Sequence, residues 1–215
     1  MIVAIKIVAA IVALLVVFDA LWRWARRRHQ LPSPTWLAWV LGGSLADWFL
    51  GTDTALDRMG LRAGFDILEI GPGPGRLRVP VAQRFGPTGR AVGLDIQEGI
   101  AERLRERAAR KDVTNLQGVV GKGSEACFPA ESFDLVFIAL TPGEIPARED
   151  TLRHCREVLR PGGRFSVTEL SPDPHFLSRR KASELAQEPR FEHEVMQGHA
   201  LFFTTNFLKP SRVSS

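Results

Sequence analysis

The chain has 215 residues, of which 45% are apolar, enough for one α/β domain with an ordinary core and an appendage. Its net charge of +4 arises entirely in the first 30 residues. The remaining 185 residues carry 23 basic and 23 acidic side chains, so no basic patch points to nucleic acid. The two cysteines and five histidines show no metal-ligand spacing, so we expect unpaired thiols and no metal site.

Residues 1–30 are predicted to be a transmembrane anchor with a basic juxtamembrane segment. The apolar run at 2–22 is interrupted only by Lys6 and Asp19 near its ends. As a helix it would span ~31 Å, about the hydrocarbon thickness of a bilayer. Tryptophans and arginines follow at 22–28, as in an aromatic belt with a cytoplasmic flank. Because the positive charge follows the run, we expect an uncleaved single-pass helix with its N-terminus outside, not a signal peptide; a buried core helix is the alternative.

Residues 31–60 are predicted to form interfacial or lid helices. Pro32 and Pro34 end the first helix, and the stretch at 35–51 is strongly apolar and contains three further tryptophans. A helix at the membrane interface, a lid over a ligand pocket and ordinary core packing would each explain this composition. The sequence leaves these three interpretations open.

The most informative stretch lies at residues 66–76, where a short buried-strand pattern runs into glycines at 71, 73 and 75. Glycine lets backbone N–H groups approach a ligand closely and adopts dihedral angles closed to other residues. The dinucleotide fingerprint spaces its glycines as G-x-G-x-x-G. This loop instead reads G-x-G-x-G, with Glu69 two residues before it. The spacing therefore disfavours a nicotinamide-dependent oxidoreductase.

The rest of the chain alternates between strand and helix patterns. Strands are predicted at 66–70, 90–95, 113–120, 132–140 and 164–170, and helices at 76–85, 98–111, 147–159 and 176–187. Two further β-like runs, 191–197 and 200–208, are predicted to form a hairpin around Gly198 and His199. The second strand ends in Asp95, about twenty residues after the glycines, where a carboxylate can accept hydrogen bonds from both hydroxyls of a ribose.

This ordered set of motifs resembles the class I S-adenosylmethionine-dependent methyltransferases, in particular those of the ubiquinone/menaquinone type and the phospholipid N-methyltransferases. Residues 69–75 match E-x-G-x-G-x-G, residues 132–136 match S-F-D-x-V, and residues 159–163 match L-x-P-G-G. The resemblance extends over residues 61–210 by the order of elements. It implies an α/β fold with a Rossmann-like seven-stranded sheet, mostly parallel with a terminal antiparallel hairpin, and helices on both faces.

The resemblance also implies where S-adenosylmethionine binds. In that family the glycine loop passes beneath the methionine part of the cofactor, and the acid ending the second strand holds the ribose. Carried over to this chain, the cofactor-binding residues are Glu69, Gly71, Pro72, Gly73, Gly75, Asp95, Ile96, Gly123, Ser124, Ala139 and Leu140.

The loop after the third strand departs from the family pattern. Many members carry Gly-Asp there, and the aspartate bonds the adenine amino group, whereas this chain has Lys122. Lysine has no acceptor. The contact is therefore lost unless Ser124, Glu125 or a backbone carbonyl replaces it.

Methyl transfer from a sulfonium is an in-line displacement by a nucleophile of the acceptor, so positioning can supply most of the rate. An ammonium or phenol acceptor must also lose a proton. The candidate bases are Glu144 after the fourth strand, His175 after the fifth and Asp47 on the predicted lid. The chain contains no tyrosine, which excludes a tyrosine base.

The predicted anchor indicates the substrate, because an enzyme tethered to the cytoplasmic leaflet meets lipids at high effective concentration. We therefore expect a membrane-anchored methyltransferase with a cytoplasmic catalytic domain. Its acceptor would be lipid-like, either a phospholipid amine or a quinone precursor. The alternatives are a membrane-tethered scaffold that binds S-adenosylmethionine without catalysis, for which Lys122 is the reason, and a methyltransferase for a soluble small molecule.

Overall fold

The computed structural model describes residues 17, 52–72, 88–110, 112–125, 127–140, 142–143, 145–171, 176–187 and 189–211. The chain divides into two units, Met1–Pro32 and Ser33–Ser215, and all of these residues except Val17 belong to the second. No helix in this described part is long and apolar enough to cross a membrane. The anchor predicted at 2–22, apart from Val17, and the segment at 31–51 lie outside the described residues, so both stay predictions.

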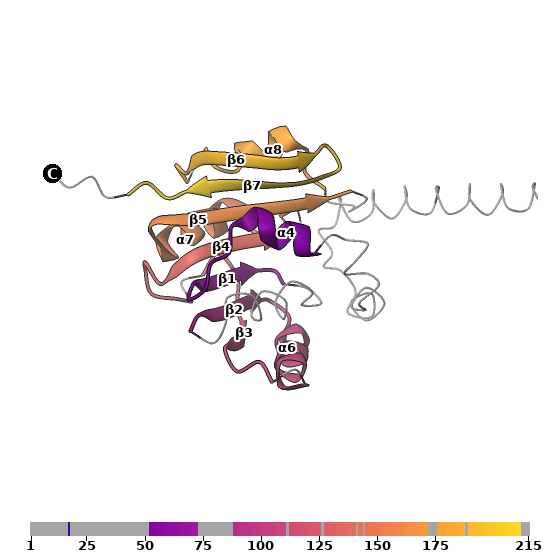
Figure 1. Ribbon diagram of the computed structural model, residues 1–215, viewed down its shortest axis with the longest axis vertical. Coiled ribbons are helices and arrows are strands. Elements are labelled where there is room, and N and C mark those ends of the chain that lie inside the picture. The colour runs from indigo at the N-terminus through magenta and orange to yellow at the C-terminus, as the bar shows by residue number, and fades with distance from the viewer. Residues whose placement is uncertain are drawn as a thin grey trace, which may run out of the picture. The chain divides into compact units, whose positions relative to one another are not determined.

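Among the described residues, seven strands form one sheet in the order β3-β2-β1-β4-β5-β7-β6 (Figure 1). Strands β1 to β5 pair in parallel, and β7 lies antiparallel to both β5 and β6. This confirms the predicted Rossmann-like sheet with its terminal antiparallel hairpin. The strand bounds are Asp66–Ile70 for β1, Arg90–Asp95 for β2, Leu116–Val120 for β3, Phe133–Ala139 for β4, Leu159–Leu170 for β5, Glu192–His199 for β6 and Phe202–Leu208 for β7.

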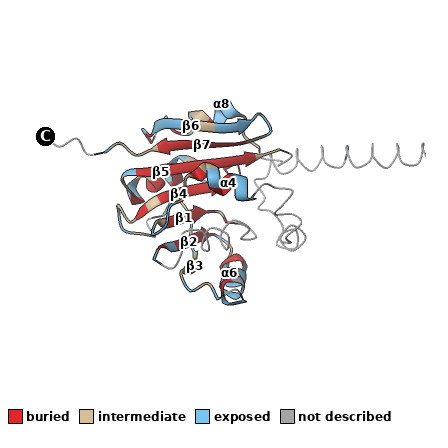
Figure 2. Ribbon diagram, viewed as in Figure 1, coloured by how far each residue is buried: buried red, intermediate tan, exposed pale blue. Residues whose placement is uncertain are grey.

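Helices lie on both faces of this sheet. Successive side chains of a strand point to opposite faces, so alternate residues belong to different buried clusters. One cluster joins Ile67 of β1 to apolar side chains of α4 and α6, and the other joins Leu68 to side chains of α7. Figure 2 shows that the central strands are largely buried whereas β6 is mostly exposed. The described helices are α4 (Thr52–Met59), α6 (Glu98–Arg110), α7 (Arg148–Val158) and α8 (Arg179–Glu184).

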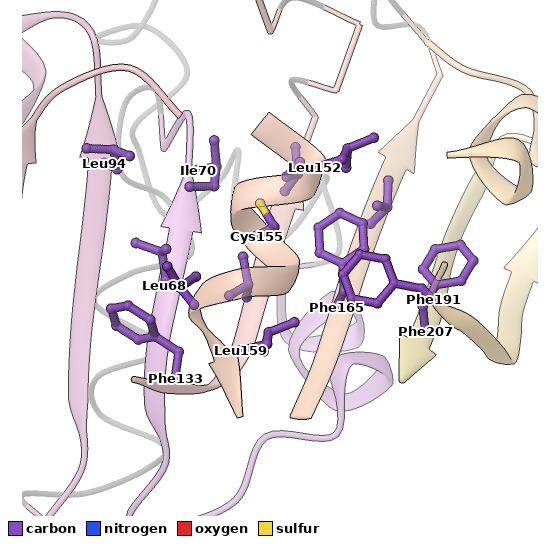
Figure 3. Packing of buried hydrophobic residues seen from close by; sticks show 14 of the residues in the cluster. Leu68, Ile70, Leu94, Phe133, Leu152, Cys155, Leu159, Phe165, Phe191 and Phe207 are labelled. Carbon is purple, nitrogen blue, oxygen red and sulfur yellow. The ribbon is translucent and has the colours of Figure 1, made fainter. Parts of the chain in front are cut away.

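Three phenylalanines hold the terminal hairpin to the parallel part of the sheet (Figure 3). The ring of Phe165 in β5 stacks on Phe191 at a centroid distance of 5.0 Å and on Phe207 in β7 at 6.0 Å. Phe165 and Phe207 are completely buried. Because each aromatic ring buries a large apolar area, this stack is a main source of stability for the β5–β7 pairing.

Helix α4 is fastened to the face of the sheet by side chains from β5 and β7. Arg164 donates from Nη1 to the carbonyl oxygen of Met59 at 3.1 Å, and its Nε and Nη2 pair with Glu194 at 2.7 and 2.6 Å. Asn206 donates to the carbonyl oxygen of Arg58 at 2.7 Å. These bonds satisfy carbonyls at the helix end that have no partner within the helix. Residues 52–59 of the predicted 31–60 segment therefore form a helix packed on the sheet.

Two of the family-like motifs meet at the amino edge of the sheet, away from the carboxyl ends of the strands. Arg160, from the L-R-P-G-G stretch, bonds the carboxylates of both Asp134 and Asp66. Asp134, from S-F-D-L-V, also accepts the backbone N–H of Asp66 at 2.8 Å. These residues join β1, β4 and β5. The aspartate and arginine of these motifs are therefore structural, and the neighbouring carboxylates raise the pKa of Arg160.

We expect Asp134→Ala to lower the free energy of unfolding by about 1–2 kcal/mol, because the part-buried N–H of Asp66 and the Arg160 guanidinium lose an acceptor. Chemical denaturation measures this change. Asp150→Ala is the matched control, since Asp150 pairs with Arg153 where both side chains are about half exposed. The control is expected to change stability by less than about 0.5 kcal/mol. Equal losses of unfolding free energy in the two variants would show that the bonds of Asp134 stabilise the domain no more than an exposed ion pair does.

The predicted position of the hairpin turn was wrong. Gly198 and His199 belong to β6, and the turn lies at Ala200 and Leu201. Gly198 has φ +103°, and a Cβ placed on it would clash with the carbonyl oxygen of Phe202. This glycine therefore allows a close approach of β7 within the strand pair, a use that the sequence does not distinguish from a turn.

Candidate functional site

The glycine loop begins at the carboxyl end of β1. Gly71 adopts φ +63°, a left-handed conformation that costs glycine little and other residues more. Its N–H donates to the carbonyl oxygen of Leu94 at 2.9 Å, which ties the start of the loop to β2. Pro72 is buried. Gly73 and Gly75 lie outside the described residues, so their predicted roles are not tested.

Asp95 ends β2 next to this loop and is 7% exposed. Its Oδ1 accepts the backbone N–H of Gln97 at 2.9 Å, which fixes the orientation of the carboxylate. Its backbone oxygen accepts the N–H of Gly121 at 2.9 Å. The following residue, Ile96, leaves an apolar side chain 47% exposed. A carboxylate fixed in this way at a strand end suits a ligand that carries paired hydroxyls.

Glu69 supplies a second carboxylate on the same face of the sheet. It lies between Gly93 of β2 and Phe137 of β4, and Asp95 follows Gly93 by two positions, so both acids point to one side. Glu69 is only 3% exposed. Carboxylates are rarely buried unless they are paired or functional. Two buried acids from neighbouring strands therefore lie on one face near the carboxyl edge, and their predicted roles toward a cofactor stay predictions.

The loop after β3 forms the next wall of the site. Gly123 packs so closely that an added Cβ would lie 2.7 Å from Cγ2 of Thr151 and 3.2 Å from Cγ2 of Ile70. Lys122 Nζ pairs with Glu125 Oε1 at 2.8 Å, and this hydrogen bond and charge raise the pKa of Lys122. Ser124 is partly exposed beside them. The loop thus sits directly against the last residue of β1, and its lysine is paired with Glu125.

We expect Gly123→Ala to lower the free energy of unfolding by about 1–3 kcal/mol and to weaken cofactor binding, because the new methyl group displaces Thr151. The double change Gly123→Ala with Thr151→Ser removes the methyl group that clashes and keeps the hydroxyl. We expect it to recover most of the loss. Thermal unfolding and calorimetric titration measure both effects. A double variant no better than Gly123→Ala would show that this contact does not set the requirement for glycine.

The carboxyl end of β4 carries backbone strain. Leu140 adopts φ +61°, which is unusual for a large side chain and is typical of functional sites. Its N–H donates to the carbonyl oxygen of Thr168 in β5 at 2.9 Å, so the strained turn is anchored. Ala139 just before it is buried. The predicted cofactor contacts of Ala139 and Leu140 stay predictions.

The three predicted bases, Glu144, His175 and Asp47, all lie outside the described residues and stay predictions. The structure adds an acid that sequence reasoning missed. Glu169, the penultimate residue of β5, is 1% exposed. Because Ser166 is the β5 residue in register with Glu69 through Phe137, Glu169 lies on the opposite face of the sheet from Glu69. The available signal was an acid beside alternating apolar residues, Phe165 and Val167, near the end of a strand pattern.

Neither a metal nor a reactive thiol is indicated in the described part of the chain. That part holds no group of three or more His, Cys, Asp or Glu side chains arranged for a metal ion. Both cysteines are free thiols, as expected. Burial raises the pKa of Cys155 to about 12, and partial burial and the Glu125 charge raise the pKa of Cys127. Both thiols therefore stay protonated at neutral pH.

Comparison with known proteins agrees with this site. A family model described as "Methyltransferase domain" matches residues 67–163. This segment, 97 of the 215 residues, is similar to methyltransferase domains, and its strand order and glycine loop agree with the class I S-adenosylmethionine-dependent type. The matched residues run from β1 to the Pro-Gly-Gly of β5 and include both buried acids and the loop after β3. S-adenosylmethionine is the cofactor that such a domain implies.

Curated relatives match the same part of the chain. Nocamycin O-methyltransferase of Saccharothrix syringae is 34% identical over 119 residues, which are 55% of this chain and 42% of that protein. Ubiquinone/menaquinone biosynthesis C-methyltransferase UbiE of Pseudomonas fluorescens is 36% identical over 118 residues, which are 54% of this chain and 46% of that protein. The chain therefore matches less than half the length of these relatives.

A solved structure supports the fold of the methyltransferase domain. A SAM dependent methyltransferase from Aquifex aeolicus superposes with a TM-score of 0.76 at 16% identity, covering 82% of this chain and 99% of that one. Within the domain, the left-handed Gly71 and the buried carboxylates of Glu69 and Asp95 suit a ligand with an ammonium group and a ribose. The residues present therefore fit S-adenosylmethionine.

Proposed function

We propose that this chain transfers a methyl group from S-adenosylmethionine to a lipid-like acceptor, either a phospholipid headgroup amine or a quinone precursor. The observation that carries the proposal is the meeting of Glu69, Gly71 and Asp95 at one edge of the sheet, inside the segment that matches a methyltransferase domain. Each of the three suits a different part of one cofactor.

In this mechanism the chain mainly binds and orients. When bound, S-adenosylmethionine supplies a methyl group already activated on a sulfonium. The Asp95 carboxylate, held by the Gln97 N–H, accepts hydrogen bonds from the ribose hydroxyls. Glu69 provides negative charge near the ammonium group, and Gly71 lets the backbone approach without a side chain in the way. The strained turn at Leu140 borders the side from which the acceptor enters, because β4 lies at the switch point of the sheet.

The lipid-like acceptor rests on two further points. The relative from Pseudomonas fluorescens is named for ubiquinone and menaquinone biosynthesis, and residues 2–22 of this chain have the composition of a membrane anchor. We propose a single-pass membrane protein with its N-terminus outside and this domain in the cytoplasm. In that arrangement the active site would work beside the bilayer.

A methyltransferase for a soluble small molecule is the second candidate, and the match to nocamycin O-methyltransferase favours it. A catalytically inactive scaffold that binds S-adenosylmethionine is the third, since Lys122 replaces an aspartate common in the family. The three candidate functions predict different products when lipid and soluble acceptors are offered together. The first predicts methylated lipid, the second a methylated soluble compound, and the third no methylated product.

The test mixes the full chain with methyl-labelled S-adenosylmethionine, phospholipid vesicles containing phosphatidylethanolamine, a reduced demethylated quinone, and the small-molecule fraction of a cell extract as the source of soluble acceptors. We expect label in the lipid extract, and we expect Asp95→Asn to reduce it strongly when the cofactor concentration is below saturation. Label confined to water-soluble products of a cell extract would contradict the lipid acceptor and support the second candidate. Binding of S-adenosylmethionine without label in any fraction would contradict the enzyme and support the scaffold.

A further inference from the structure

The carboxyl edge of the sheet presents three neighbouring positions for one extended ligand. The strand order places β1, β2 and β3 side by side. Glu69 and Gly71 lie at the first of them, Asp95 at the second, and the loop at 121–125 follows the third. Asp95 pairs in register with Val120, and its backbone oxygen accepts the Gly121 N–H. A base attached to a ribose at Asp95 therefore reaches the loop after β3.

Two apolar side chains beside Asp95 are exposed to solvent. Ile96 and Val120 are each 47% exposed. One follows Asp95 directly, and the other is the register partner of Asp95. Exposed aliphatic side chains flanking an anchored carboxylate provide a surface for the flat face of a purine.

The loop after β3 also carries a hydrogen-bond donor and a hydrogen-bond acceptor next to each other, the side chains of Lys122 and Glu125. Lys122 Nζ lies 2.8 Å from Glu125 Oε1. The turn that presents them is closed by the Glu125 N–H, which donates to the carbonyl oxygen of Lys122 at 3.0 Å, and by the Cys127 N–H, which donates to that of Glu125 at 2.8 Å. Their side chains are 67% and 57% exposed. Because an exposed pair of this kind contributes little to stability, its groups are available to a ligand at small cost.

We propose that Lys122 and Glu125 together recognise the edge of the adenine ring, with Lys122 Nζ donating to N1 and the Glu125 carboxylate accepting from the 6-amino group. Adenine presents an acceptor at N1 beside a donor at its amino group, and the ion pair presents the complementary donor and acceptor. The pair would replace the single aspartate that is common at position 122 in the family. This inference rests on the proposed function, because it concerns the cofactor of that same reaction.

The test is calorimetric titration of the full chain with S-adenosylhomocysteine and two analogues. In the 1-deaza analogue C–H replaces N1, and in the 6-deamino analogue hydrogen replaces the amino group. We expect each analogue to bind the wild-type chain roughly 5- to 20-fold more weakly, as for a charge-assisted hydrogen bond at a part-exposed site. Lys122→Met is expected to bind the 1-deaza analogue as well as the natural ligand. Glu125→Ala is expected to do the same with the 6-deamino analogue.

Two controls make the result specific. Glu106→Gln disrupts another exposed ion pair, with Arg110 on α6 at 3.0 Å, and is expected to leave all three affinities unchanged. Ser124→Ala removes the nearest hydroxyl of the loop and is expected to leave the preference for the amino group intact. Loss of that preference in Ser124→Ala but not in Glu125→Ala would overturn the proposal.

The titration distinguishes a failure of the proposed function from a failure of adenine recognition by Lys122 and Glu125. If the wild-type chain binds neither S-adenosylmethionine nor S-adenosylhomocysteine, the proposed function itself fails. If it binds S-adenosylhomocysteine and both analogues equally well, recognition by Lys122 and Glu125 is overturned and the proposed function stands. Thermal unfolding checks that each variant is folded, and exposed substitutions of this kind are expected to leave the midpoint almost unchanged.

Discussion

Asp95→Asn is expected to weaken the binding of S-adenosylhomocysteine on the order of 100-fold, as measured by calorimetry. The change removes the negative charge from a carboxylate that is 7% exposed and suited to accept from two ribose hydroxyls. Hydrogen bonds to a charged group contribute about 1.5–3 kcal/mol each, and each 1.4 kcal/mol corresponds to a factor of ten in affinity. Asparagine keeps an oxygen for the Gln97 N–H, so the end of β2 is expected to stay folded.

Asp112→Asn is the matched control for this change. Asp112 is exposed and adopts φ +51°, a conformation that asparagine accepts as readily as aspartate. It follows α6, away from the carboxyl edge, and we expect its replacement to leave affinity within about twofold. Retained affinity in Asp95→Asn would show that the acid ending β2 does not hold the ribose.

Phe165→Ala is expected to lower the free energy of unfolding by about 3–5 kcal/mol. Phe165 is completely buried, and its ring stacks on those of Phe191 and Phe207 (Figure 3). Removing it opens a cavity where β5 meets the hairpin, which surrounding side chains fill only in part. Domains of this size are commonly stable by about 5–15 kcal/mol, so the loss is a large share of the total. Denaturant titration measures it.

Phe165→Leu gives the graded comparison for that site, since it leaves a smaller cavity and a smaller loss is expected. It also keeps the test valid if the alanine variant fails to fold. Leu201→Ala is the exposed control: Leu201 is 58% exposed in the turn between β6 and β7, and its loss is expected to cost less than about 0.5 kcal/mol. Equal costs for Phe165→Ala and Leu201→Ala would contradict the packing described for the hairpin.

Much of the fold could be predicted because local patterns specify it. The apolar runs around Glu69 and Phe137 each form a buried parallel strand. Because the glycine loop directly follows the first of these strands, it lies at the carboxyl edge of the sheet. Asp95 was predicted from its distance to the glycines, and the structure places it beside Gly71. These features depend on residues close together in the sequence, which is why a single sequence was sufficient.

Features that depend on distant partners could not be predicted. Arg164 closes the end of α4, about a hundred residues away in the chain, and nothing around either segment indicates the other. Asp134 belongs to a family-like motif, yet its structural role becomes visible only once Arg160 lies beside it. Glycines are ambiguous for the same reason: Gly198 looks like a turn residue until the backbone of β7 is seen against it.

The most direct test of the central claim is a crystal structure of the chain with S-adenosylhomocysteine bound. We predict density for the ribose within hydrogen-bonding distance of the Asp95 carboxylate, the homocysteine part over Gly71 and close to Glu69, and the adenine against the loop at 121–125. A ligand bound elsewhere, with no ribose at Asp95, would contradict the cofactor site and with it the proposed methyl transfer.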